Sequence, residues 1–455
     1  MTGIDRSRVE ALVKRERDRY HADHPGSRRV HEQAGHLFGR VPMTWMSKWV
    51  GGFPLAYATA HGNRVTDVDG HEYVDFALGD TGAMAGHSPR ATVAAVQRRI
   101  GVDGGITTML PTEDAEWVGA ELTRRFGLPR WSFTLSATDA NRWAVRLARL
   151  VTGKPKLLVF SYCYHGSVDE TFVVIEPDGL PASRPGNVAP AVDPTTTTRV
   201  AEWNDLAAVE RELAHGDVAA ILAEPALTNI GIVLPEPGFL DGLRELATRY
   251  GALLMIDETH TFSAGPGGMT ARDGLRPDVF VIGKAIGGGI PSGAYGLTEE
   301  VADRVHRITA AGSADIVDVG GVGGTLAGNA LSLAAMRATL GEVLTDGAFA
   351  HMISLAGAYT EDVRRVLDET GVPWSITQLG ARAEYRFTRP APRSGGESAA
   401  AADDLLDEYM HLFTLNRGIL MTPFHNMALM CPDTSPADIA YHTETFTQAV
   451  TDLLA

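Results

Sequence analysis

The chain has 455 residues, of which 44% are hydrophobic and 21% are charged. This composition excludes wholesale disorder, and the length exceeds the roughly 250–300 residues at which a single hydrophobic core usually stops growing. The formal net charge is −16. It argues against nucleic acid or an anionic membrane as the main partner, because both are bound through an excess of Lys and Arg. We therefore expect an acidic, soluble protein with more than one hydrophobic core.

The sequence shows no sign of a disulfide framework, a metal site or a targeting segment. Cys163 and Cys431 lie far apart and lack metal-ligand spacing, and we expect Cys163 to be a small buried filler. The first 23 residues alternate charges at a helical period and contain no apolar run long enough for a signal peptide. No window of about 18 uncharged apolar residues predicts a transmembrane helix. The expected location is the cytoplasm.

The predicted elements begin with a charged helix, followed up to about residue 60 by an extended segment that contains Trp45, Trp49 and Phe53. Asn63–Ala77 predicts a β-hairpin, because apolar residues alternate around an Asp-Gly turn at Asp69–Gly70. From about 90 to 330, short apolar runs alternate with helical patterns, which predicts a mostly parallel sheet covered by helices on both faces. The runs are Trp131–Leu135, Lys156–Phe160, Val218–Ala223, Ala252–Ile256 and Val279–Ile282.

The last third of the sequence predicts a smaller α+β domain. Two long helical patterns, Leu331–Leu344 and Ala350–Thr370, precede mixed strands and a final helix from about Ser435. The polar stretch Ser394–Ala402 predicts a surface loop. We therefore divide the chain into an N-terminal helix and hairpin segment (1–75), a large domain (76–330) and a C-terminal small domain (331–455). The first segment is expected to pack with the small domain.

Lys284 directly follows a predicted strand, at a position where a ligand can bind. The segment Val279–Gly296 runs from an apolar strand into Lys284 and then into a Gly-rich turn. The carboxyl ends of strands in an α/β sheet are where ligands usually bind. A lysine held there among apolar neighbours is disfavoured in its charged form, and a neutral amine can attack a carbonyl. From these residues alone, a lysine that extends from the strand end into solvent is the commoner explanation.

An acidic pair ends another predicted strand, in Leu253–Phe262, where Asp257 and Glu258 follow an apolar run. A buried acid needs a positive partner or several hydrogen-bond donors to stay ionised, although purely structural and metal-binding acids also occur at such places. Asp257 precedes Lys284 by enough residues for one helical crossover between neighbouring strands. Both side chains can therefore face the same cleft.

A helix start forms the third signal, because the run Trp131–Leu135 stops at Ser136 and a helical period begins near Ala140. Ser136, Thr138 and Asp139 are good N-cap residues, and a simply capped helix is the more frequent explanation. Alternatively, the exposed amides of the helix start and the hydroxyls of Ser136 and Thr138 receive a phosphate. An aldehyde-reactive lysine, an acid for a cationic ring nitrogen and a phosphate cup are together what pyridoxal 5′-phosphate (PLP) requires.

With these motifs in place, the chain resembles the class III, fold type I PLP-dependent aminotransferases from VTDVDGHEYVDF near residue 65 to the last helix. It is most similar to the branch that includes glutamate-1-semialdehyde aminomutase and the amine and β-amino-acid transaminases. The resemblance implies an α/β fold with a large domain, whose mostly parallel sheet is sandwiched by helices, and a smaller C-terminal domain. It also implies a homodimer with shared active sites.

The resemblance assigns roles to individual residues. Lys284 in GKAIGGGIPSGAYG would hold PLP as a Schiff base, Asp257 in IDETHT would keep the pyridine nitrogen protonated, and Tyr164 in CYHGS would stack on the ring. It also implies a phosphate cup at Ser136-Ala137-Thr138, in which Ala replaces the family's Gly. In the motif AEPALTN, which contains Glu224, Asn229 would contact the phenolic oxygen of the cofactor. Thr259 would lie beside the second ring face in place of the family's Val, and Thr325 in GGTLAGN would reach the phosphate of the partner subunit.

The expected reaction is ping-pong transamination from an amine or amino acid to a keto or aldehyde acceptor, with Lys284 acting as general base and then acid. An intramolecular aminomutase or an amino-acid racemase on the same cofactor is the alternative. The aminomutase branch carries an Arg for the substrate carboxylate where Pro42–Gly52 offers Met43 and Trp45. The predicted gating segment Glu176–Pro190 also lacks the Gly-Ser-Gly opening of that branch. A binding module without chemistry is disfavoured, because Lys284, Asp257 and Tyr164 are all present.

Further candidates concern the substrate. Trp45 and Trp49 fit pocket lining as well as an interface or a core. Arg382, Glu384 and Arg386 alternate along ARAEYRF and share one strand face. Either Arg would suit a substrate carboxylate, but a solvated strand face is the more frequent outcome for such a pattern. His425 in TPFHNM follows a Pro turn, which fits a residue near the cleft and a surface histidine equally.

Overall fold

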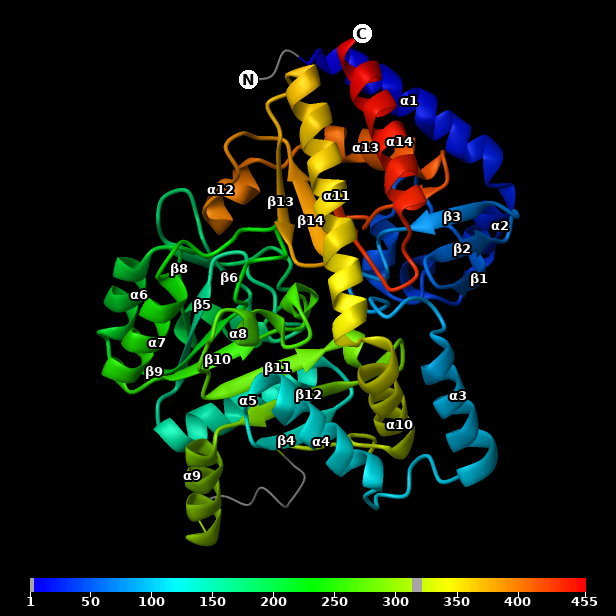
Figure 1. The fold of residues 1–455 in the computed structure, drawn as a ribbon. Helices are drawn as coiled ribbons and strands as arrows, with labels where there is room; N and C mark the ends of the chain where they lie inside the picture. The colour runs from blue at the N-terminus through cyan, green and yellow to red at the C-terminus, as the bar shows by residue number, and fades with distance from the viewer. Residues whose placement is uncertain (1–3, 313–320) are drawn as a thin grey trace. The chain divides into compact units, whose positions relative to one another are not determined.

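The computed structural model describes residues 4–312 and 321–455 and divides into two compact units (Figure 1). Unit 1 comprises residues 1–89, 347–391 and 401–455, and unit 2 comprises residues 90–346 and 392–400. The two long boundaries fall at 89/90 and 346/347, where the sequence predicted 75/76 and 330/331. Among the described helices, none combines the length and the apolar composition needed to cross a membrane.

Unit 2 is built on a sheet whose described strands run in the order β4-β12-β11-β10-β9-β5-β8. Strands β8, β5, β9, β10 and β11 are mutually parallel, and β12 runs antiparallel to both β11 and β4. The mostly parallel sheet that the sequence predicted is therefore confirmed. Its strands are β4 (Arg130–Thr134), β5 (Lys156–Phe160), β8 (Thr198–Ala201), β9 (Val218–Ala223), β10 (Leu253–Asp257), β11 (Val279–Gly283) and β12 (Gly293–Leu297).

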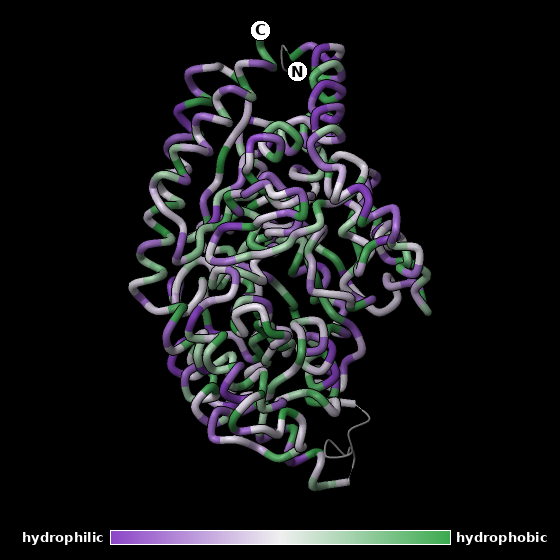
Figure 2. The backbone as a smooth tube through the Cα atoms, turned by 90° about the vertical axis from the view of Figure 1, so that its right-hand side faces the viewer, coloured by the Kyte–Doolittle hydropathy of each residue, from purple (hydrophilic) through white to green (hydrophobic). Residues whose placement is uncertain are grey.

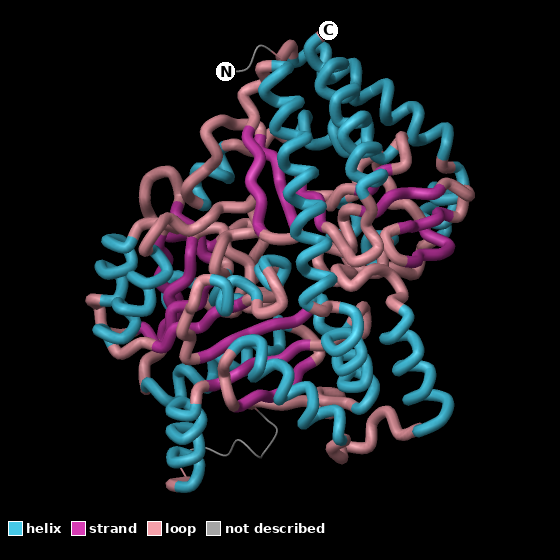
Figure 3. The backbone as a smooth tube through the Cα atoms, viewed as in Figure 1, coloured by secondary structure: helices cyan, strands magenta, loops and turns pink. Residues whose placement is uncertain are grey.

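Helices surround these strands in unit 2 (Figure 3). The apolar faces of α5, α6 and α7 pack against the sheet in one continuous core, which is why β9, β10 and β11 are buried along their whole length. The helices of this unit are α3 (Arg90–Arg98), α4 (Glu113–Phe126), α5 (Ala137–Thr152), α6 (Leu206–Leu213), α7 (Phe239–Tyr250), α8 (Gly268–Arg272), α9 (Glu299–Ala310), α10 (Ala330–Ala338) and α12 (Gly395–Ala400); β6 (Val173–Ile175) and β7 (Pro181–Ser183) form a separate hairpin.

In unit 2 the strand β12 was missed from the sequence and one loop was wrongly predicted, and in both segments a glycine allows close packing. The strand β12 was not predicted because it lies in the Gly-rich segment. A Cβ on its Gly296 would lie 2.9 Å from the Trp131 indole. The predicted loop Ser394–Ala402 instead contains the helix α12. A Cβ on its first residue, Gly395, would lie 2.2 Å from the carbonyl oxygen of Ser161.

Unit 1 contains two small sheets of described strands, with the orders β1-β2-β3-β15 and β13-β14-β16. The predicted hairpin is confirmed, since β2 and β3 pair antiparallel with Val65 opposite Tyr73. Figure 2 shows polar and apolar residues alternating along the long helices, as expected for helices that bury one face. The elements are α1 (Arg6–Asp23), α2 (Pro25–Gln33), β1 (Tyr57–His61), β2 (Arg64–Asp67), β3 (Glu72–Asp75), α11 (Asp346–Thr370), β13 (Ser375–Leu379), β14 (Arg382–Arg386), α13 (Asp404–Leu415), β15 (Ile419–Leu420), β16 (Met427–Leu429) and α14 (Pro436–Leu454).

The segment between the first helices and β1 differs from the predicted extended segment. A second helix, α2, follows α1, and short 3-10 helices form at Phe38–Arg40 and Thr44–Lys48. Pro25 occupies the first turn of α2, where its missing N–H costs nothing, so the proline begins a helix instead of ending one.

The close approach of β11 to α5 yields a stability prediction. A Cβ on Gly283 would lie 2.9 Å from both the amide nitrogen and the Cβ of Ala137, and backbone atoms cannot turn aside. Gly283→Ala should therefore lower the free energy of unfolding by about 1–3 kcal/mol, the usual cost of overpacking. The measurement is urea unfolding of the purified chain.

Gly119→Ala in α4 is the matched control, because nothing lies within 4 Å of its added Cβ. In a helix this change should stabilise by up to about 1 kcal/mol. Equal unfolding free energies for wild type and Gly283→Ala would contradict the tight contact between β11 and α5.

Candidate active site

The predicted site residues of unit 2 come together at one edge of its sheet. The ends of β10 and β11 are joined there, because the Glu258 amide donates a hydrogen bond of 2.9 Å to the carbonyl oxygen of Val281. The start of α5 reaches the same edge, where Asn141 Nδ2 donates to Asp257 Oδ2 at 2.8 Å. The close contact between Gly283 and Ala137 brings the backbone before Lys284 against the first turn of α5. Lys284, Asp257 and the Ser136–Thr138 segment thus lie at the same edge of the sheet.

Asp257 is buried, with 3% of its surface exposed, and several donors stabilise its charge. His165 Nδ1 and Asn141 Nδ2 lie 2.9 and 2.8 Å from Oδ2, while the amide and hydroxyl of Thr259 donate to Oδ1 at 3.0 and 2.6 Å. Burial by itself raises the pKa of Asp257, but the hydrogen bonds from His165, Thr259 and Asn141 outweigh it and lower the pKa below its ordinary value. Asp257 is therefore an anion at neutral pH.

The pKa of the neighbouring acid, Glu258, is shifted in the opposite direction. It is fully buried and accepts hydrogen bonds from the Thr261 hydroxyl and from the amides of Met269 and Thr270. Burial raises the pKa of Glu258, and these hydrogen bonds offset only part of that effect. Glu258 accordingly fixes the backbone that follows β10, while Asp257 presents the negative charge.

Lys284 does not extend from its strand into solvent. It is half-buried, and its Nζ lies 2.7 Å from Nε2 of His260. Its backbone has φ +50°, the left-handed region, which costs a residue with a Cβ roughly 1–2 kcal/mol. Such conformations persist where the surrounding structure enforces them, and they are concentrated at functional sites. The left-handed backbone at Lys284 therefore costs stability and fixes the direction in which its side chain leaves the strand.

The start of α5 offers amides and two hydroxyls. Ser136 is the N-cap and accepts a hydrogen bond of 3.2 Å from the Asp139 amide, and Thr138 Oγ1 accepts one of 3.2 Å from the Ser167 amide. A Cβ on Gly166 would lie 2.0 Å from Thr138 Oγ1, so this glycine allows the loop after β5 to reach the helix start. The first amides of a helix lack partners within the helix and suit an anion such as a phosphate.

The remaining predicted cofactor contacts have the following surroundings. Asn229 donates a hydrogen bond of 3.1 Å to the Tyr162 carbonyl, and buried Glu224 accepts one from the Thr228 hydroxyl. Tyr164 is half-buried, with its ring edge-on to Phe172 at 6.2 Å. Two further predictions concern threonines: the hydroxyl of Thr259 donates a hydrogen bond to Asp257, and Thr325 is exposed.

Sequence reasoning missed three residues of the site: Asn141, His165 and His260. His165 stands directly after Tyr164, and His260 stands three positions after Asp257, so both lay inside motifs already chosen and were passed over because neighbours carried the resemblance. Asn141 is the only polar residue in a run of apolar positions on α5 that are otherwise buried in the core. A fully buried amide on an apolar helix face is the signal that would have identified it.

Two buried polar atoms beside Asp257 test the fit of a cofactor. Within residues 4–312 and 321–455, His165 Nε2 and Asn141 Oδ1 have no hydrogen-bond partner. Buried polar atoms in folded proteins are nearly always paired, so unpaired ones mark room for a polar group. A buried anion, a directed amine and a helix start with hydroxyls are the donor set that a phosphorylated pyridine aldehyde requires. The residues present therefore fit PLP.

One prediction in unit 1 was wrong about burial, and one open alternative is decided. Arg382, Glu384 and Arg386 do share β14, but all three are at least nine-tenths buried rather than forming a solvated face. The reason is that β14 is the central strand between β13 and β16. His425 is also buried rather than lying on a surface turn, with Nδ1 3.3 Å from Glu384 Oε1.

The aromatic and cysteine predictions have mixed outcomes. Trp45 is 37% exposed and meets Phe424 edge-on at 5.4 Å, so it is not a core residue, and Trp49 is half-buried. Cys163 is 2% exposed, which confirms it as a buried filler.

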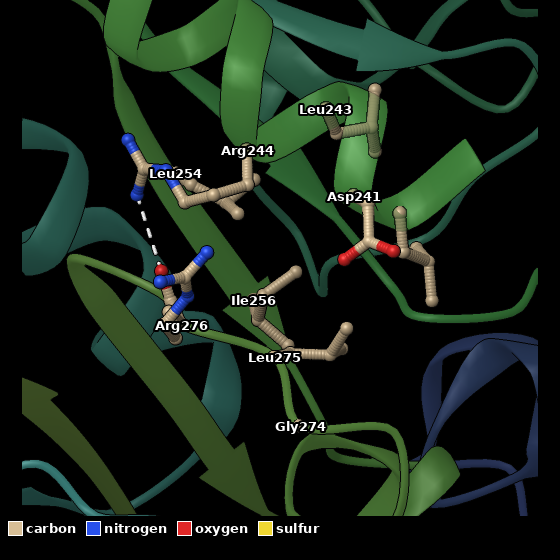
Figure 4. A pocket seen from close by; sticks show the side chains of 9 residues that line it. Asp241, Leu243, Arg244, Leu254, Ile256, Gly274, Leu275 and Arg276 are labelled. Atoms are coloured by element: carbon tan, nitrogen blue, oxygen red, sulfur yellow. Dashed lines mark hydrogen bonds between the residues drawn. The ribbon is translucent and has the colours of Figure 1, made fainter. Parts of the chain in front are cut away.

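A separate hollow in unit 2 contains none of the predicted site residues (Figure 4). It is lined by α7, by Leu254 and Ile256 of β10, and by the loop at residues 274–276. Arg244 crosses it to the Arg276 carbonyl at 3.2 Å. Arg244 also pairs with Asp278 at 2.7 Å, so its charge is already compensated, and we assign no ligand to this hollow.

Comparisons with known proteins show the family of the chain. Residues 45–449 match the model of the aminotransferase class-III family. The chain belongs to that family. A glutamate-1-semialdehyde 2,1-aminomutase from Nitratidesulfovibrio vulgaris (strain DP4) is 36% identical over 374 residues, which cover 81% of this chain and 85% of the relative.

Solved structures extend the likeness over the whole chain. A glutamate-1-semialdehyde-aminomutase from Pseudomonas aeruginosa PAO1 has a TM-score of 0.96 and 49% identity, covering 99% of this chain and 100% of that chain. A variant of that protein was solved in complex with PMP. A β-phenylalanine aminotransferase from Variovorax paradoxus has a TM-score of 0.85 and 27% identity, with 97% of both chains covered. The chain is a fold type I enzyme of class III, and its cofactor is PLP.

The Asp257–His165 pair predicts a pH-dependent stability. Burial opposes the charged form of His165, but its contacts with Cys163 and Asp257 outweigh burial and raise the pKa of His165 well above the usual value. A raised pKa gives stability that is complete below the unfolded pKa of about 6.5 and is lost as pH rises through the folded pKa. The lowered pKa of Asp257 gives stability that is present above about 3.9 and is lost as pH falls.

His165→Gln should therefore destabilise the cofactor-free chain most between about pH 4 and 6.5, and progressively less at higher pH. Urea unfolding of wild type and variant at a series of pH values measures the difference. His306→Gln, on the exposed face of α9, is the matched control and should change the free energy of unfolding little. A pH-independent loss in His165→Gln would show that the histidine is neutral and packs without charge.

Proposed function

We propose that this enzyme is an intramolecular aminomutase of the glutamate-1-semialdehyde type, which exchanges an amino group and a carbonyl on neighbouring carbons of one substrate. The directed amine of Lys284 beside the buried anion of Asp257 supports PLP-dependent amino-group chemistry. Identities of 36% and 49% over most of the chain to proteins of that name support this particular reaction. The sequence alone favoured ping-pong transamination and gave the aminomutase reaction as the alternative; we now propose the aminomutase reaction first.

We assign the cofactor contacts as follows. Bound PLP supplies an electron-withdrawing ring that stabilises negative charge on the substrate carbon bearing nitrogen. Lys284 holds the aldehyde carbon covalently, and Asp257 holds a cation at the ring nitrogen. Ser136, Ala137 and Thr138 bind the phosphate through the start of α5. The remaining contacts are Tyr164 at the ring face, Asn229 with Glu224 on the side of the phenolic oxygen, and Thr259 behind Asp257.

Asp257 performs its role because its own surroundings fix both its charge and its position. Four hydrogen bonds hold the carboxylate, and they keep its pKa low despite burial. A carboxylate that is anionic and immobile stabilises a cation without reorganisation during the reaction. His165 and Asn141 are positioning residues in this proposal, since they act through Asp257.

Lys284 performs the proton transfers. Once the substrate amine has replaced it, Lys284 takes a proton from the substrate carbon as general base and returns a proton to a neighbouring atom as general acid. The left-handed backbone at Lys284 and the contact of Gly283 with α5 restrict where this amine can lie. One group that serves both steps needs such restriction, because proton transfer requires hydrogen-bond distance.

Ping-pong transamination is the second candidate, and two features of this chain favour it. Pro42–Gly52 presents Met43 and Trp45 where the aminomutase branch carries an Arg, and both residues are exposed. The segment Glu176–Pro190 contains β7 of a short hairpin and lacks the Gly-Ser-Gly opening. The two reactions share their first half, so all cofactor contacts are the same.

We further propose a cytoplasmic homodimer with shared sites. Thr325 is exposed, as is its neighbour Leu326, which has 48% of its surface exposed.

The test of the proposed reaction is turnover of a single substrate. We expect the holoenzyme, given glutamate 1-semialdehyde alone, to convert it to the isomer in which amino group and carbonyl have changed places, with product equal to substrate consumed. Conversion that requires a keto acceptor, with one acceptor used per product, would contradict the aminomutase and support the transaminase.

Removal of the lysine tests the assignment of Lys284. Lys284→Ala should lose at least about 100-fold in turnover, because it lacks the general base and acid. It should also retain no PLP after borohydride reduction and denaturation, as measured by mass spectrometry. Lys14→Ala is the control, since that side chain is 78% exposed on α1. Full turnover by Lys284→Ala would overturn the assignment.

A further inference from the structure

A histidine contacts the reactive lysine. His260 Nε2 lies 2.7 Å from Lys284 Nζ, a distance typical of a hydrogen bond between a charged and a neutral group. His260 follows Asp257, Glu258 and Thr259, so it stands one position beyond the family's Asp-Glu-Val motif. The histidine that bonds to Asp257 is a different one, His165. The two histidines of the site are therefore committed to different partners.

The framework holds this contact from both sides. Before His260, the Glu258 amide is bound to Val281 of β11, and after it the Phe262 amide donates 2.8 Å to the Glu258 carbonyl. The buried Glu258 side chain fixes the same turn through Thr261. On the other side, Lys284 is confined by its left-handed backbone and by the packing of Gly283 on α5. The separation of the two nitrogens is thus set by both strand ends.

Two basic nitrogens at this distance hold one proton between them. One nitrogen donates and the other accepts, because protonating both would place two positive charges within hydrogen-bond distance. Lysine side chains in water are protonated at pH 7, and an amine attacks a carbonyl or removes a proton from carbon only through its free lone pair. Imidazole usually titrates near neutral pH and is suited to accept that proton and return it.

We propose that His260 is the proton partner of Lys284, a role that rests on the proposed function of Lys284. Nε2 of neutral His260 takes a proton from the Lys284 ammonium: an Nζ–H bond breaks, an Nε2–H bond forms, and the positive charge moves from lysine to histidine. Lys284 would then be a neutral amine, able to bond to the aldehyde carbon of PLP with release of the aldehyde oxygen as water and to act as base toward the substrate. The reverse transfer restores the ammonium. His260 contacts the reacting nitrogen and is by this criterion catalytic.

The first experiment follows attachment of PLP rather than turnover. PLP is added to the cofactor-free full-length chain, and the rate of its linkage to Lys284 is followed by absorbance and, after borohydride reduction, by mass spectrometry. His260→Gln keeps a polar side chain that can hydrogen-bond but cannot exchange a proton. We expect His260→Gln and His260→Ala to slow attachment at pH 7 by at least about tenfold, because general base catalysis contributes about 10²–10⁴. His306→Gln should attach PLP at the wild-type rate.

The second experiment uses the holoenzyme and a substrate deuterated at the carbon bearing nitrogen. We expect His260→Gln to lower kcat by about 100-fold with little change in KM, and to increase the isotope effect, since proton transfer becomes slower. Attachment and kcat at wild-type rates in His260→Gln would overturn the proposal, because they would show that a hydrogen bond alone is sufficient.

The two proposals can fail separately. Suppose that the wild-type enzyme does not isomerise glutamate 1-semialdehyde while His260→Gln still slows PLP attachment. This result would support His260 as the proton partner of Lys284 and would contradict the proposed aminomutase reaction. If isomerisation occurs and His260→Gln does not affect PLP attachment, the result supports the aminomutase reaction and contradicts the proposed role of His260. Far-ultraviolet circular dichroism and urea unfolding confirm that each variant is folded.

Discussion

The site depends on how the chain stabilises one buried carboxylate. Asp257 ends an apolar strand, and a charge there is costly unless it is paired and hydrogen-bonded. Its donors come from three segments: Asn141 on α5, His165 in the loop after β5, and Thr259 in its own loop. Satisfying this single charge therefore fixes the relative positions of three segments that are distant in sequence.

Close packing around two glycines also holds these segments of the site together. Gly283 lets β11 touch the first turn of α5, and Gly166 lets the loop after β5 reach Thr138. Each added Cβ would collide with a backbone or side-chain atom, so these contacts specify the geometry as strictly as the hydrogen bonds do. Lys284 enters the site directly from one of them, with its backbone in a left-handed conformation. The reactive amine is thus directed by packing, and the anion by hydrogen bonds.

Local patterns predicted most strands of the large sheet. β5 and β9 lie where their apolar runs predicted, and Lys284 and Asp257 were found because each directly follows such a run. β12 escaped because its glycines resemble a turn, whereas they serve to accommodate Trp131. Arg382 on β14 was misjudged because burial of a charged strand depends on the neighbouring strands, which periodicity does not reveal. His260 was missed because its importance lies in a contact with a residue from another strand.

The family is shown by similarity over most of the chain, whereas the choice between aminomutase and transaminase is a proposal that turnover of a single substrate decides. The central claim is narrower: one PLP molecule contacts all three strand-end groups at once. A crystal structure of the holoenzyme tests it most directly. We predict the ring nitrogen within hydrogen-bond distance of Asp257, the aldehyde carbon bonded to Lys284, and the phosphate at the start of α5. A phosphate bound away from α5, or a ring nitrogen facing another residue, would contradict the account.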